Sequence, residues 1–182
     1  MKNRLTVRKI SFLGLLIALA LVMYIIENLV PSFWIPGAKL GLSNIFTLLC
    51  IILLGLPETI ILVSLRTTLG CLITGNMSAL PYSLIAGLVA CVIGWIILTF
   101  LVPKFSIVSC SVCMAIVHNI IQTLVFCLIT QSLSTINILP YLALLGFLSG
   151  LIVGIVSYLL VTKVPNSIFI WLYKEPKKSN IN

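Results

Sequence analysis

Acidic residues are almost missing from this chain of 182 residues, which has no aspartate, three glutamates and one histidine. Without paired aspartates it lacks the usual means of holding magnesium on a diphosphate. No serine, histidine and carboxylate stand in a pattern typical of a hydrolase, and the glycine-rich phosphate loop with its lysine is missing too. We therefore expect no autonomous enzyme, no catalytic residue, no metal ion and no cofactor.

Charged residues of either sign are also scarce, at 8% of the chain, whereas 61% of the residues are hydrophobic and the mean hydropathy is +1.29. A soluble domain cannot cover its surface with so few polar side chains, so the surrounding medium must be lipid. The net charge of +8 is concentrated near the chain ends, which is typical of cytoplasmic flanks in membrane proteins and not of nucleic-acid binding. The six cysteines lie in apolar runs and are expected to be small helix fillers.

Long apolar runs broken by proline, glycine and polar residues predict an all-α integral membrane protein with six transmembrane helices in one membrane domain, residues 1–182. The expected spans are 10–30, 40–55, 58–74, 79–102, 106–131 and 138–162, of which 40–55 is short for a full crossing. The tail 163–182 is expected at the cytoplasmic interface. Because lysine and arginine are concentrated in the segments that this topology places inside, we expect both termini in the cytoplasm and a multi-pass protein of the bacterial cell membrane.

Arg66 is the one arginine beyond residue 8, and it lies in the middle of the apolar run 59–73. Placing a guanidinium at the centre of a bilayer costs at least ~2.5–3.5 kcal/mol on insertion scales. Two carboxylates could pair with it, but Glu58 lies ~12 Å away along the helix axis, and Glu27 is expected at the outer end of the first helix. We therefore favour contact with an anionic ligand over a structural ion pair.

Strongly polar side chains in the expected spans are confined to the central and outer parts of the membrane. Polar side chains at such depths usually face a bundle interior or a cavity, and Gln122 shares a helical stripe with His118 and Asn119. The residues predicted to bind a substrate in a pocket open to the outside are Lys39, Asn44, Arg66, Asn76, His118, Asn119 and Gln122. The alternative is that they only join neighbouring helices by hydrogen bonds. For His118, Asn119 and Gln122 taken singly, the two interpretations weigh equally.

Small residues at a spacing of four mark two smooth helix faces. Gly14 and Ala18 form one on the first helix, which we expect to be a docking surface for another membrane protein. Gly146, Gly150 and Gly154 form the other, and there we favour packing within the bundle.

Five segments together resemble the Gx transporter family, also known as heptaprenyl diphosphate synthase component I. They are Pro36-Gly-Ala-Lys-Leu-Gly-Leu-Ser-Asn44, Arg66 with Gly75-Asn76, Ala115-Ile-Val-His-Asn-Ile-Ile-Gln122, Leu139-Pro-Tyr141, and Gly146 to Gly154. Ser43 departs from the family pattern, in which alanine is expected. The family is similar to the substrate-binding (S) components of energy-coupling factor (ECF) transporters. The resemblance implies a six-helix bundle, a ligand pocket near the outer face, and a small-residue face on helix 1 that meets a transmembrane coupling subunit served by two ATPases.

Three hypotheses follow. The leading one is an S component for uptake of a small anionic or amphipathic compound. The second is an accessory membrane subunit of heptaprenyl diphosphate synthase in polyprenyl or quinone biosynthesis, and the third is a solitary membrane scaffold that binds no small molecule.

Overall fold

The computed structural model describes residues 7–29, 41–101, 106–165, 168 and 172, and all regular structure in these residues is helical. This confirms the predicted all-α class. The six α-helices are α1 (Val7–Leu29), α2 (Asn44–Leu53), α3 (Leu56–Ile73), α4 (Leu80–Ile96), α5 (Ile107–Thr130) and α6 (Leu139–Lys163). Three short helical segments, η1 (Met77–Ala79), η2 (Ile97–Leu101) and η3 (Leu133–Ile138), flank them. The helix bounds lie within four residues of the expected ranges, except that α4 ends at Ile96 and is continued by η2.

Local sequence signals account for several helix ends. Proline stands in the first turn of α3, α4 and α6, where its fixed φ suits a helix start and its missing N–H costs no hydrogen bond. Ser106 caps α5, because its hydroxyl oxygen accepts a hydrogen bond of 3.2 Å from the Ser109 N–H.

Five helical stretches are long and apolar enough to cross a membrane: Val7–Asn28, Leu56–Ile73, Met77–Leu101, Ile107–Thr130 and Thr135–Lys163. The helix α2 differs, because its 10 residues rise only ~15 Å, about half of a hydrocarbon core of ~30 Å. The described residues therefore contain five candidate spans and one half-length helix, where the sequence predicted six spans.

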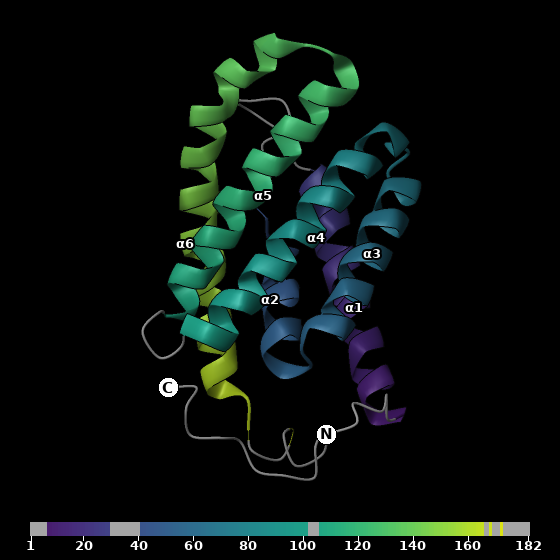
Figure 1. Cartoon of the computed structure of the whole chain (residues 1–182). Coiled ribbons are helices and arrows are strands. Elements are labelled where there is room, and N and C mark those ends of the chain that lie inside the picture. Colours follow the sequence, from purple (N-terminus) through teal and green to yellow (C-terminus); the bar gives the residue numbers. More distant parts are fainter. Residues whose placement is uncertain (1–6, 30–40, 102–105, 166–167, 169–171, 173–182) are drawn as a thin grey trace.

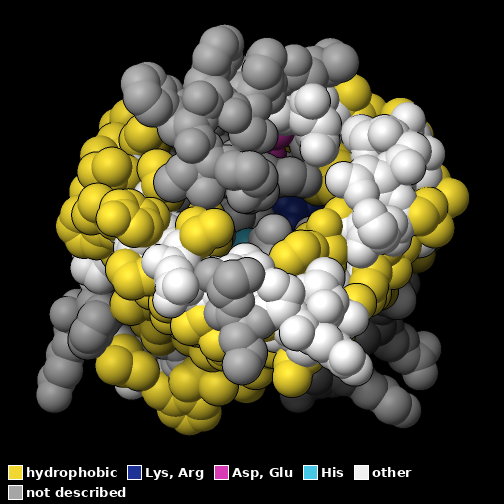
Figure 2. Space-filling model, turned by 90° about the horizontal axis from the view of Figure 1, so that it is seen from above, with side chains coloured by type: hydrophobic (Ala, Val, Ile, Leu, Met, Phe, Trp, Pro, Cys, Tyr) yellow, Lys and Arg dark blue, Asp and Glu magenta, His cyan; other side chains and the backbone are white. Residues whose placement is uncertain are grey.

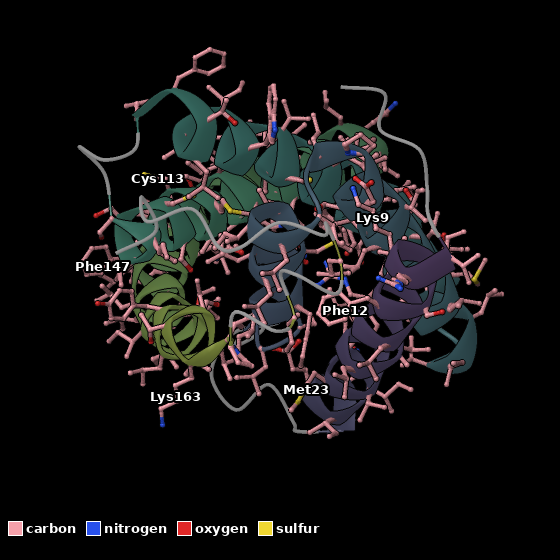
Figure 3. All side chains as sticks on the ribbon, turned by 90° about the horizontal axis from the view of Figure 1, so that it is seen from below. Lys9, Phe12, Met23, Cys113, Phe147 and Lys163 are labelled. Carbon is pink, nitrogen blue, oxygen red and sulfur yellow. The ribbon has the colours of Figure 1, made fainter. Side chains whose placement is uncertain are left out.

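The long helices surround α2. Figure 1 shows α5 between α4 and α6, with α1 beside α3, and α2 packs against α1, α3, α4 and α6. We call the end at which α1 begins and α6 ends the base, and the opposite end the top. Viewed from the base, α2 lies between α6 (green) and α1 (purple), while the side chain of Lys163 points away from it (Figure 3). Since α2 starts at mid-height and runs to the base, it fills only the base half of the bundle centre.

The close contact between α5 and α6 explains why Gly146, Gly150 and Gly154 recur along one face of α6. A Cβ at Gly150 would lie 2.7 Å from the Val112 Cα, and one at Gly154 would lie 2.8 Å from the Val108 Cα. At Gly146 it would lie 3.1 Å from the Ala115 carbonyl oxygen. Only glycine permits this approach of two helix backbones, as is common in membrane bundles. The prediction that this stripe packs inside the bundle is confirmed.

Candidate functional site

The candidate site lies where α2 begins. Gly41 has a φ of +72°, a conformation that favours glycine, and the Asn44 N–H closes the turn onto the Gly41 carbonyl oxygen at 2.9 Å. This turn leads directly into the first residues of α2. The positive end of the α2 dipole therefore lies at mid-height inside the bundle.

Arg66 reaches this helix start from α3. Its side chain is only 4% exposed, and Nη1 donates to Ser43 Oγ at 2.9 Å and to Asn44 Oδ1 at 3.1 Å. Within the described residues, the buried Nε has no hydrogen-bond partner. One edge of the guanidinium is thus held by α2, while Nε keeps a donor that no described group satisfies.

Glu27 of α1 supplies the balancing charge. Its Oε1 accepts from the Leu42 N–H and its Oε2 from the Ser43 hydroxyl, the latter at 3.3 Å. The Ser43 Oγ therefore links the Glu27 carboxylate to the Arg66 guanidinium, and the Glu27 charge stabilises the charge of Arg66. The sequence had placed Glu27 too far towards the outer face for this. Glu58 lies instead in the first turn of α3 at the base, buried, with Oε2 unbonded among the described groups.

Two narrow cavities adjoin this charge network, with volumes of about 20 Å³ and about 40 Å³. Each has room for one or two water molecules. Arg66, Asn44, Gly41, His118 and Ser149 line both of them. The side chains of α1, α2, α3, α5 and α6 thus converge on one polar centre.

A third cavity is much larger, about 380 Å³, and is lined by side chains of α4, α5, α6 and η3. Tyr82 and Phe126 form one wall and meet edge to face, with ring centroids 5.5 Å apart. Asn119 and Gln122 line both this cavity and the second narrow one. The large, mainly apolar space therefore adjoins the polar centre along one stripe of α5.

The structure brings five of the seven predicted binding residues together: Asn44, Arg66, His118, Asn119 and Gln122 line the cavities. Asn119 also joins two helices, since its Nδ2 donates to the Leu142 carbonyl oxygen at 2.8 Å. Asn76 is not with them, because it is exposed before η1 and its Oδ1 accepts from Ser78 Oγ at 2.9 Å. Lys39 lies outside the described residues.

Sequence reasoning missed Glu27, Ser43, Tyr82 and Phe126 as members of the site. A signal for the α2–α3 contact was present, because Asn44 and Arg66 each stand eleven residues from Gly55. In two antiparallel helices joined at Gly55, residues equally distant from the turn lie at equal height. The contribution of Glu27 from α1 had no comparable signal.

From the top, the site is visible as a hollow. Figure 2 shows basic, acidic and histidine side chains near the centre of this face, with hydrophobic side chains on part of the surrounding surface. Helices long and apolar enough to cross a membrane, arranged around a buried polar centre, define an α-helical membrane protein with an internal polar site.

A family model for heptaprenyl diphosphate synthase component I matches residues 16–160, and the chain belongs to this family. The match confirms the family expected from the sequence. It does not test the further resemblance to ECF S components. No curated protein and no solved structure matches the chain.

Proposed function

We propose that this chain is the substrate-binding component of an ECF-type uptake transporter and captures a small amphipathic compound. Its six helices would lie in the bacterial cytoplasmic membrane with both termini inside and the top of the bundle outward. The observation that carries the proposal is the cavity system above α2, which joins a buried charge network to an apolar space of about 380 Å³. A structural bundle has no need for such a space, whereas ligand pockets fall in the range of ~300–1,000 Å³.

Charge placement supports the orientation. Of the four basic residues in the described ranges, Arg8, Lys9 and Lys163 stand at the base and Arg66 lies inside the bundle. Basic residues favour the cytoplasmic side, so the base would face inward and the hollow outward. A substrate could then reach the pocket from outside the cell.

The exposed face of α1 supports a membrane partner. Gly14 and Ala18 are both exposed, and a Cβ at Gly14 would meet no atom within 4 Å. Such a smooth face lets another helix approach closely. We assign it to the transmembrane coupling subunit, through which two ATPases would supply the energy.

The second candidate is an accessory membrane subunit of heptaprenyl diphosphate synthase, which the name of the family favours. In either role the chain would not be an autonomous enzyme, because the sequence contains no aspartate with which to hold a metal-bound diphosphate.

Co-purification separates the two candidates. The tagged full-length chain is extracted from native membranes in mild detergent, and its partners are identified by mass spectrometry. We expect a membrane subunit and two ATPases. A double variant, Gly14→Leu with Ala18→Leu, should lose them, while Ile152→Leu, a substitution at an exposed position of α6, should retain them. Recovery of a soluble, aspartate-rich synthase would contradict transport and support the second candidate.

A further inference from the structure

The cavity system divides into two compartments with different chemistry. The apolar compartment lies between the outer parts of α4, α5 and α6, and its lining includes Tyr82, Phe126, Ile138 and Leu142. None of the lining residues that the structure describes is charged. Aromatic faces and branched side chains of this kind bind rings or short branched hydrocarbon chains by burial of apolar surface.

The polar compartment is small, and the charges of its described lining residues cancel. Its two cavities have volumes of about 20 Å³ and about 40 Å³, so they admit a compact polar group and not a diphosphate. Among the described residues that line them, Arg66 is the one basic side chain and Glu27 the one acidic side chain.

The Glu27 carboxylate already holds the position that an anion would take at the α2 start. It accepts hydrogen bonds from the Leu42 N–H and from Ser43 Oγ. A ligand anion must therefore use the remaining side of Arg66 and come close to Glu27. One added anion can accept a hydrogen bond from Arg66, which lines both narrow cavities, but the several charges of a diphosphate would repel the buried Glu27 carboxylate more strongly at short range.

We infer that the ligand has one compact head with a single negative charge, of the carboxylate type, attached to an apolar body of ring or short-prenyl size. The head contacts Arg66 beside α2, and the body occupies the compartment of Tyr82 and Phe126. Asn119 and Gln122, which line both compartments, orient the junction between head and body. Prenyl diphosphates, the compounds that the family name suggests, are disfavoured by their charge and by the size of the head. This inference rests on the proposed capture function.

The test compares three probes with the same hydrocarbon chain: geranate, geraniol and geranyl diphosphate. Their dissociation constants are measured by calorimetry on the full-length protein in nanodiscs, with empty nanodiscs to subtract partition into lipid. We expect geranate to bind at least ~10-fold more tightly than geranyl diphosphate, a difference of about 1.4 kcal/mol. In Glu27→Gln, this ratio should shrink, because the repelling charge is gone while an acceptor for the Leu42 N–H remains.

A second pair of variants tests where the apolar body of the ligand binds. Tyr82→Ala with Phe126→Ala should weaken geranate binding ~10-fold or more by removing buried aromatic surface, whereas Tyr141→Ala, an aromatic residue exposed on α6, should leave it unchanged. Tighter binding of geranyl diphosphate would overturn the inference about the head but leave capture standing. Unchanged binding in the Tyr82 and Phe126 variant would overturn the location of the body. If none of the three probes bound to the folded protein, the inference would fall and the proposed capture function would lose its support.

Discussion

The base half and the top half of the bundle centre are surrounded by the same helices but have opposite character. The base half holds α2 and an apolar core that includes Cys50, Leu62 and Cys110, with Glu58 buried in the first turn of α3. The top half has no central helix in the described residues and contains buried Glu27, Ser43 and Arg66 beside cavities. The comparison teaches that the site exists because the central helix is only half as long as its neighbours.

The buried side chains of the two halves are also stabilised by different interactions. In the base half, apolar side chains fill most of the space and need no specific partner. In the top half, two opposite charges are joined by a serine hydroxyl, so removal of one charge leaves the other buried without that counter-charge. Substitutions in the base half should therefore lower stability alone, whereas substitutions in the top half should also weaken ligand binding.

The largest effect is expected at Arg66. Arg66→Met should lower the free energy of unfolding by up to ~3–5 kcal/mol, because Glu27 then stays buried without its counter-charge. Thermal denaturation in detergent measures this loss, and geranate binding should vanish. The double variant Arg66→Met with Glu27→Gln should recover most of the stability but none of the binding. Equal stability of the single and the double variant would show that the two charges do not interact.

A core substitution in the base half should be nearly as costly but should not affect the ligand. Leu62 is 0% exposed, and Leu62→Ala should cost ~2–5 kcal/mol through lost burial and a cavity. Leu69→Ala is the matched control, since Leu69 lies on the same helix and is 39% exposed. Calorimetry should show the wild-type affinity for geranate in the folded fraction of Leu62→Ala. A lower affinity of folded Leu62→Ala for geranate would contradict the expectation that base-half substitutions leave ligand binding unchanged.

A smaller effect is expected where α1 meets α3. A Cβ at Gly70 would lie 2.5 Å from the Tyr24 ring, so Gly70→Ala should cost ~1–3 kcal/mol by overpacking. Because Tyr24 stands one turn before Glu27 on α1, the shift should also weaken ligand binding. Gly14→Ala, where no atom lies within 4 Å, should be neutral or slightly stabilising. Thermal unfolding of both variants checks the pair, and equal midpoints would contradict the close approach.

The smallest effect is expected at Ser43, whose hydroxyl links the two charges. Ser43→Ala, which introduces the residue that the family pattern suggests, should cost ~0.5–1.5 kcal/mol, as for the loss of one hydrogen-bonding group. Ser78→Ala is a control in which an exposed serine hydroxyl loses its bond to Asn76. Identical unfolding curves for the wild type and Ser43→Ala would indicate that Glu27 and Arg66 do not depend on the serine.

Several elements of the fold and site could be predicted from the sequence. Long apolar runs and proline starts locate the helices, and the cost of burying polar groups in lipid marks Arg66, His118, Asn119 and Gln122 as interior residues. Asn76 lies between the expected spans 58–74 and 79–102, where burial in lipid gives no constraint, and a loop residue is free to face solvent whatever its type. The position of Glu27 was not predicted either, since the depth of a side chain near a helix end depends on how neighbouring helices are staggered.

The sequence by itself determined that lipid surrounds the protein, where the helices run, and which polar side chains need hydrogen-bond partners inside the bundle. It could do so because composition and periodicity act locally along the chain. Only the tertiary structure decided that the short helix α2 packs among α1, α3, α4 and α6, that Glu27 and Arg66 meet through Ser43, and that Tyr82 and Phe126 enclose an apolar space beside them. These contacts join residues from separate helices. Their geometry follows from helix stagger and close glycine packing, which no single segment specifies.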